Sequence, residues 1–136
     1  MRLEDLGKLI LRVTIGGLLL MHGIGKITGM EGAMSFIGGA LTSHGLPDAI
    51  KYGVYLGEVV GPILLLLGFL TRLGAVMIVV NMAMAIFLAR MDKVGQVVTG
   101  GAWGVELEAL FLLGALAVFC LDAGSISMRK GVPKID

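Results

Sequence analysis

Hydrophobic residues occupy four long stretches of the chain, and the segments between them carry most of its polar residues. An α-helix rises 1.5 Å per residue, so about 20 apolar residues cross the roughly 30 Å of hydrocarbon in a bilayer. Stretches of that length predict four membrane-spanning helices, at residues 5–27, 49–70, 72–90 and 103–122. The alternation over about ten residues that is typical of barrel strands does not occur in the sequence. We therefore expect an all-α protein with one domain, residues 1–136, folded as a four-helix transmembrane bundle.

The connections between the predicted helices differ in length and character. Within the first connection, residues 34–41 predict a short helix at the membrane interface, and the Gly-Leu-Pro segment at 45–47 predicts a turn that begins the second span. Only Thr71 and Arg72 separate the second span from the third, which predicts a tight helical hairpin. A polar, glycine-containing loop at 91–102 leads to the last span.

Basic residues are distributed unevenly between the two sides that these spans imply. Four spans place both termini on one side, together with the link between the second and third spans. That side carries seven basic residues: Arg2, Lys8, Arg12, Arg72, Arg129, Lys130 and Lys134. The other side carries four: Lys26, Lys51, Arg90 and Lys93. Because basic residues accumulate on the cytoplasmic side, we expect cytoplasmic termini and a multi-pass protein of the inner (cytoplasmic) membrane.

The composition favours the lipid bilayer as the surroundings and excludes several classes of protein. Hydrophobic residues make up 57% of the chain and charged residues 15%, against roughly 45–50% apolar residues in soluble domains. A net charge of +1 with scattered basic residues excludes nucleic acid as a partner. Cys120 is the single cysteine, and the sequence has neither a CxxCH haem motif nor metal-ligand spacing. We therefore expect no metal and no covalently bound cofactor, so that any redox group must be a bound molecule.

Small residues on the second span predict close packing between helices. Gly53, Gly57 and Gly61 recur every four residues and share one face, where small residues let two helices approach closely in lipid. Two interpretations remain open: this face packs the helices of one chain, or it forms the interface of a homo-oligomer. The nine methionines leave a similar choice between ordinary packing and an adaptable ligand pocket.

Polar and ionisable residues inside the spans are the candidate functional residues. A charge at membrane depth costs about 2.5–3.5 kcal/mol, so it usually faces a partner, a cavity or a ligand. These residues are Arg12, His22 and Lys26 in the first span, Glu58 in the second, Asn81 in the third, and Glu106 with Glu108 in the fourth. The helical rise places most of them in the outer half of the membrane. We therefore expect an outward-opening cluster with a further polar residue beneath it: His22, Lys26, Glu58 and Glu106 above, and Arg12 or Asn81 below.

The predicted cluster has two interpretations. In the first, its members form ion pairs that determine which helices pack together. In the second, they bind a ligand and relay protons. Arg12 and Glu58 fit either interpretation, because a long guanidinium side chain could join them. His22 favours the second, since an imidazole titrates near neutral pH and can donate a hydrogen bond to a quinone carbonyl.

These residues stand in segments that resemble the DoxX family of small bacterial and archaeal membrane proteins, over nearly the whole chain. The segments are LRVTIGGLLLMHGIGKI, HGLP, GEVVGPILLLLGFLTRLGAV, VELEALFLL and DAGSISM. The positions that match the pattern of the family are Arg12, His22, Gly23, Lys26, Glu58, Gly61, Thr71, Arg72 and Glu106. Two departures are clear. Gly61-Pro62 replaces a pair of glycines and should bend the second helix, and Arg129 stands in place of a closing aspartate.

The resemblance implies a four-helix integral membrane protein associated with redox chemistry. Members of the family are described as subunits of thiosulfate:quinone or terminal quinol oxidoreductases, or as membrane partners of oxidative-stress enzymes. Our first hypothesis is therefore a membrane subunit or anchor of a redox complex, in which a partner protein holds the electron carrier. His22 and Lys26 would hydrogen-bond a quinone oxygen, and Glu58 and Glu106 would relay protons.

Two other functions remain open. A small proton-coupled transporter would use Glu58 as its exchanging carboxylate, although comparable small exporters carry their essential glutamate in the first helix, where this chain has Arg12 and His22. A structural assembly platform would use the charges only to specify packing. An enzyme that acts alone has the least support, since the sequence contains no nucleophile with its base, no metal centre and no phosphate-binding loop.

Overall fold

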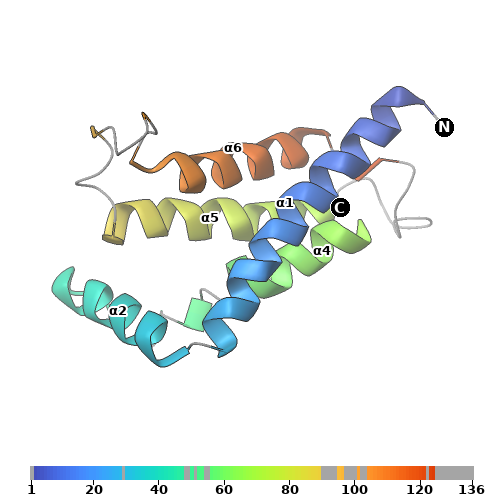
Figure 1. The fold of residues 1–136 in the computed structure, drawn as a ribbon. Coiled ribbons are helices and arrows are strands. Elements are labelled where there is room, and N and C mark those ends of the chain that lie inside the picture. The colour runs from blue at the N-terminus through green and yellow to red at the C-terminus, as the bar shows by residue number, and fades with distance from the viewer. Residues whose placement is uncertain are drawn as a thin grey trace.

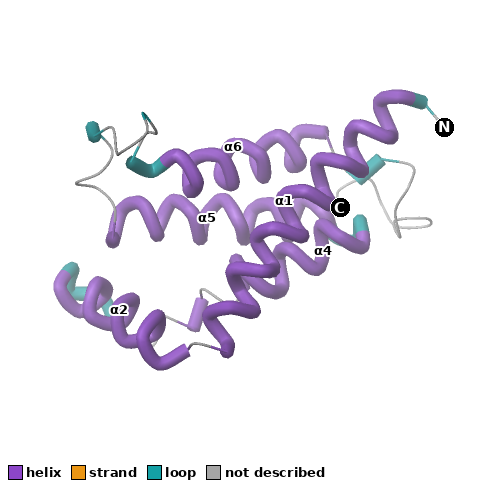
Figure 2. The backbone as a smooth tube through the Cα atoms, viewed as in Figure 1, coloured by secondary structure: helices purple, strands orange, loops and turns teal. Residues whose placement is uncertain are grey.

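In the computed structural model, every regular element among the described residues is a helix (Figures 1 and 2). The described residues are 2–28, 30–47, 50, 52–53, 56–89, 95–96, 101, 104–121 and 123–124, with the backbone alone at 26–28, 30–36, 56 and 88–89. The prediction of an all-α protein is confirmed for this part of the chain. Most of the predicted loop at 91–102 lies outside the described residues.

Helix α1, Leu3–Thr28, corresponds to the first predicted span. Glu4 and Asp5 lie in its first turn, where carboxylates interact favourably with the helix dipole. Among the described helices, α1 alone contains a segment that is long and apolar enough to cross a membrane, Leu3–Gly25. Two shorter apolar segments are Gly57–Leu67 and Thr71–Phe87. Length and composition therefore give one candidate span among the described helices.

Helix α2, Met30–Ser43, follows α1 and includes the short helix predicted at 34–41. It ends in a Schellman motif, in which the N–H of Leu46 donates to the carbonyl of Leu41 at 2.9 Å. Gly45 has a φ of 73°, the left-handed conformation that this motif requires. The predicted Gly-Leu-Pro turn therefore begins as the cap of α2. In Figure 1, α2 projects away from the other helices.

The second predicted span, 49–70, is not one continuous α-helix. Its described part contains a π-helix, η2 (Leu56–Val60), followed by the short α-helix α4 (Gly61–Leu67). Pro62 explains the change, because in an α-helix the carbonyl of Glu58 would pair with the nitrogen of Pro62, which carries no hydrogen. The wider i→i+5 pattern of a π-helix avoids that pairing. The predicted bend is thus a change of helix type.

The link between the second and third helices lies earlier in the chain than predicted. The N–H of Gly68 donates to the carbonyl of Leu64 at 2.9 Å, and Gly68 has a φ of 71°, so this residue is the left-handed cap that ends α4. Thr71 and Arg72 are the first residues of α5, Thr71–Ala89, instead of the link. A glycine in this position is a helix C-cap signal, and it gives the correct boundary.

Helices α5 and α6 agree with the last two predicted spans. Helix α5 ends at Ala89, one residue before the predicted end at 90. Helix α6 is Glu106–Leu121, against a prediction of 103–122 whose two end residues lie outside the described part. Figure 1 shows α5 and α6 side by side, with α1 and α4 crossing them as a second pair. The buried core that the four helices share consists of Ile15, Leu19, Leu65, Ala75, Ile78, Met82, Phe111, Ala115 and Val118.

Glycines at the helix crossings bring backbone against backbone. A Cβ placed on Gly74 of α5 would lie 2.8 Å from the carbonyl oxygen of Gly61, closer than real Cβ atoms come to other atoms. Gly57 packs instead against the side chain of Asn81 of α5, which leaves no space for a Cβ. A Cβ on Gly53 would meet nothing within 4 Å. Two of the three glycines on the predicted small-residue face therefore pack against another helix of the same chain.

The start of α1 and the end of α6 lie at the same end of the bundle. Gly124, just beyond α6, is buried against the side chain of Lys8, since a Cβ on Gly124 would lie 3.2 Å from the Lys8 Cβ. This arrangement places the first turns of the chain next to its last described residues.

Candidate functional site

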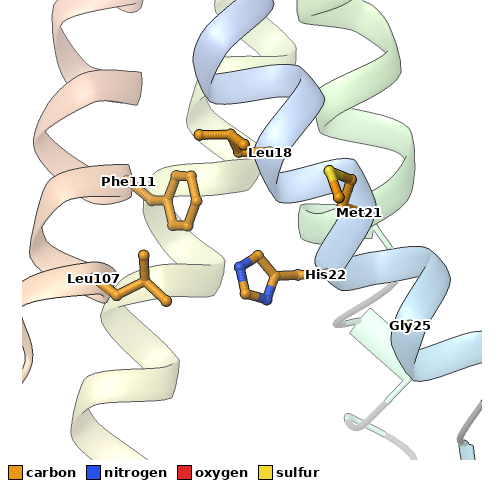
Figure 3. A pocket seen from close by; sticks show the side chains of 6 residues that line it. All are labelled: Leu18, Met21, His22, Gly25, Leu107 and Phe111. Carbon is orange, nitrogen blue, oxygen red and sulfur yellow. The ribbon is translucent and has the colours of Figure 1, made fainter.

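An open groove of about 550 Å³ lies between α1 and α6 (Figure 3). Its lining residues are Leu18, Met21, His22 and Gly25 of α1, with Leu107 and Phe111 of α6. The volume lies within the roughly 300–1,000 Å³ that small-molecule sites occupy. His22 contributes an ionisable side chain to a lining that is otherwise apolar. Such a lining suits a mainly apolar ligand that carries one polar group.

The helical repeat of α1 explains why His22 faces the groove. Leu18, His22 and Gly25 recur at i, i+4 and i+7, so they share one face. Leu19 and Gly23 share the neighbouring face, which is buried. Because consecutive helical residues are about 100° apart, the imidazole of His22 lies on a different side of α1 from the surface on which Gly23 packs.

The imidazole of His22 contacts an aromatic ring, and its nitrogens have no hydrogen-bond partner among the described residues. Its ring centroid lies 5.8 Å from that of Phe111, and the two planes meet at 81°, an edge-to-face arrangement. Phe111 is itself buried and supports the imidazole from one side. A polar group that lacks a partner in hydrocarbon costs several kcal/mol. The ring nitrogens of His22 are therefore available to a molecule that enters the groove.

Arg12, in the first half of α1, stabilises the C-terminal end of α4. Its side chain is 1% exposed, and its Nη1 donates to the carbonyl oxygen of Leu65 at 2.7 Å. Leu65 lies in the last turn of α4, where the carbonyls carry partial negative charge and favour a cation. Arg72 repeats the arrangement on α6, since its Nε donates to the carbonyl of Phe119 at 2.9 Å. Each arginine therefore caps the C-terminus of a neighbouring helix.

Glu58 is buried where η2 meets α1 and α5. Its side chain is 5% exposed, and its backbone carbonyl lies directly against Gly23 of α1, with no space for a Cβ. Asn81 of α5 packs its side chain on the adjacent Gly57. Glu58 is absent from the residues that line the groove. The backbone of Glu58 therefore packs on Gly23, whereas the side chain of His22 lines the groove beside α6.

The remaining predicted site residues lie near the start of α6 or outside the description. Glu106 and Glu108 are in the first turn of α6, and the exposed Glu106 directly precedes Leu107 of the groove. The side chain of Lys26 lies outside the described residues. Within the described part of the chain, no three histidine, cysteine, aspartate or glutamate residues form a group that could hold a metal ion. The predicted cluster is therefore divided: His22 lies in the open groove, and Glu58 lies at the buried junction of η2 with α1 and α5.

Sequence reasoning did not find the α6 wall of the groove. Leu107 and Phe111 are four residues apart and share one face of α6. Apolar residues surround that helix on every side, so its pattern does not distinguish this face from the others. The position of α6 beside α1, which only the packing shows, identifies the two residues.

Comparisons with known proteins show what the sequence is similar to. The sequence model of the DoxX family matches residues 7–91, which include the α1 side of the groove and end before α6. The chain is 33% identical over 87 residues to a Bacillus subtilis (strain 168) protein named "Putative oxidoreductase CatD", covering 64% of this chain and 62% of that protein. The chain therefore spans less than two thirds of that relative.

A second relative aligns over more of the chain. An "Uncharacterized protein" of Haemophilus influenzae (strain ATCC 51907 / DSM 11121 / KW20 / Rd) is 33% identical over 118 residues, which cover 87% of this chain and 84% of that protein. No solved structure matches the chain. An alignment of 118 of the 136 residues is long enough to include residues from both walls of the groove.

Proposed function

Because the chain belongs to the DoxX family, we propose that it is a membrane subunit or anchor of a redox complex that binds a quinone in the groove between α1 and α6. The family and the similarity to a protein named as an oxidoreductase support a redox-associated membrane protein. The quinone is our own step beyond them. The size and lining of the groove support it.

One observation carries this step: His22 brings a polar ring to an apolar groove and has no hydrogen-bond partner among the described residues. A quinone complements both properties. Its carbonyl oxygen accepts a hydrogen bond from an imidazole N–H, and its ring and tail suit the Leu18, Met21, Leu107 and Phe111 side chains. When bound, a quinone supplies two-electron, two-proton redox chemistry, and a partner protein supplies the electron carrier.

The proposal includes four membrane spans with cytoplasmic termini. The helices α5 and α6, with 19 and 16 residues, measure about 28 and 24 Å, close to the roughly 30 Å of hydrocarbon. Arg12 and Arg72, which cap neighbouring helices, lie toward the end of the bundle where α1 starts and α6 ends. The excess of basic residues on that side supports its assignment to the cytoplasm. The groove then lies in the outer half of the bilayer, in an inner (cytoplasmic) membrane.

Proton exchange with the ligand is assigned to the α6 side of the groove. Glu106 precedes Leu107 and is exposed, so it can exchange protons with the aqueous outer side. Glu58 has no contact with the ligand in this proposal, because it does not line the groove. A role for Glu58 would therefore be indirect, through the position of α1.

The proposal is tested by quinone binding to the purified protein in lipid nanodiscs. Decylubiquinone is titrated against the wild type, His22→Ala and the control His44→Ala. His44 lies beside the α2 cap and bonds the Ala40 carbonyl at 2.9 Å, so it has no part in the groove. We expect His22→Ala to weaken binding about tenfold, the effect of roughly 1.4 kcal/mol for one hydrogen bond in an apolar site.

The outcomes separate the proposal from its alternatives. Unchanged affinity in His44→Ala with weaker binding in His22→Ala supports the groove. A wild type that binds no quinone, or equal affinities in all three proteins, contradicts it. Glu58→Gln should leave the affinity within about twofold of wild type, and a larger loss would place the ligand at the η2 junction instead.

A further inference from the structure

Three glycines of α1 differ in what their missing side chain permits. A Cβ on Gly16 would lie 2.9 Å from the carbonyl oxygen of Pro62, and a Cβ on Gly23 would overlap the backbone of Glu58. Packing therefore requires both residues to be glycine. A Cβ on Gly25 would meet no heavy atom within 4 Å. The packing of the helices gives no reason for glycine at this third position.

Glycine inside a helix costs about 0.5–1 kcal/mol relative to alanine, because it loses more backbone freedom on folding. A methyl group would fit at Gly25, as it would at Gly7 and Gly17, and of these three glycines only Gly25 lines the groove. What Gly25 does provide is space, because it lines the groove one helical turn from His22. The missing side chain leaves open the part of the groove between α1 and Leu107.

The groove has two unequal ends around the imidazole. Toward Leu18, Phe111 contacts the His22 ring edge-to-face, so that side of the ring is occupied. Toward Gly25, the α1 wall has no side chain, as Figure 3 shows beside the imidazole. A planar group that bonds the His22 nitrogen therefore fits at the Gly25 end. An apolar tail fits along Leu18 and Met21.

We propose that Gly25 selects the ligand of this groove by leaving space for a flat ring beside His22. This inference rests on the proposed function and specifies it further: the ligand is a membrane lipid with a planar quinone or quinol head at the Gly25 end. A side chain at position 25 excludes the ring and leaves the tail path open. Gly25 is thus a specificity-determining residue, because its lack of a side chain leaves space for the ring.

The test compares side chains added at two glycines of α1. Gly25→Leu adds its side chain inside the groove, and Gly17→Leu is the matched control, because a Cβ on Gly17 also meets nothing within 4 Å but Gly17 does not line the groove. Each variant is titrated in nanodiscs with decylubiquinone, and with decanol, which has the same tail length without the ring. We expect Gly25→Leu to weaken decylubiquinone binding about tenfold and to leave decanol unchanged. Gly17→Leu should match the wild type with both probes.

The results distinguish this inference from the function on which it rests. If His22→Ala weakens decylubiquinone binding while Gly25→Leu does not, the selection by Gly25 is overturned and the quinone groove stands. Equal losses for decylubiquinone and decanol overturn it too, because the side chain would then block the tail. A wild type without quinone binding overturns both. If circular dichroism shows that Gly25→Leu does not fold, Gly25→Ala is used in its place. We expect it to weaken decylubiquinone binding about threefold.

Discussion

Arg12 and His22 are ionisable residues of the same helix, and their surroundings are opposite. Arg12 is buried and donates a 2.7 Å hydrogen bond to the last turn of α4. His22 is exposed in a groove, where its ring meets that of Phe111 in an otherwise apolar lining. An ionisable group that is buried with a hydrogen bond maintains the fold, whereas one that is left open to a groove can bind a ligand. Charge within a predicted span therefore does not by itself identify a functional site.

A similar contrast holds for Gly23 and Gly25, two glycines of α1 close to His22. A Cβ on Gly23 would overlap the backbone of Glu58 in η2, whereas a Cβ on Gly25 would meet no heavy atom within 4 Å. They are two residues apart, about 200° around the helix, and so they face opposite sides. One side of this turn of α1 is closed by packing, and the other is open to a ligand.

The largest expected effect is the loss of the helix cap at Arg12. Arg12→Ala removes the hydrogen bond to Leu65 and leaves a cavity, so the free energy of unfolding should fall by about 3 kcal/mol. His22→Ala should cost only about 1 kcal/mol, the value of one aromatic contact. Unfolding in mixed detergent micelles, followed by circular dichroism, measures both. The exposed Arg2→Ala is the control, and an equal loss in Arg12→Ala and His22→Ala would remove the contrast between these residues.

A smaller effect is expected at the paired glycines. Gly23→Ala forces a methyl group onto the backbone of Glu58 and should lower the free energy of unfolding by about 2 kcal/mol. Gly25→Ala should raise it by about 0.5 kcal/mol, because alanine favours the helix and meets no atom there. The same unfolding measurement applies to both variants. Opposite signs are the essential result, and destabilisation by both would show that the groove side of α1 is also packed.

The smallest effect is expected at Thr71, at the start of α5. Its side chain is fully buried, and its Oγ1 has no hydrogen-bond partner among the described residues. Valine has nearly the same shape without the hydroxyl, so Thr71→Val should leave stability unchanged or raise it by up to about 1 kcal/mol. Thermal unfolding, with Thr71→Ala as the cavity-forming comparison, measures the difference. A loss in Thr71→Val would show that this hydroxyl is a structural hydrogen-bonding group, as Arg12 is.

Much of the helical architecture was predictable because it depends on local sequence. The apolar runs gave the first, third and fourth helices nearly to their ends, since helix length and end residues are properties of a continuous segment. The second run is not one continuous α-helix, because Pro62 changes the helix type and Gly68 ends α4 before Thr71. Both residues are local sequence signals, and the structure shows their effects on the type of helix and on its end.

The sequence by itself determined which residues of α1 are polar and which share a face, because the helical repeat depends on nothing outside the helix. The tertiary structure alone decided which neighbour each face meets. Arg12 bonds a carbonyl 53 residues away, and the groove of His22 exists only because α6 packs beside α1. Such contacts join segments that are remote in the chain, and in a bundle whose helices are apolar on all sides no single segment specifies its neighbour.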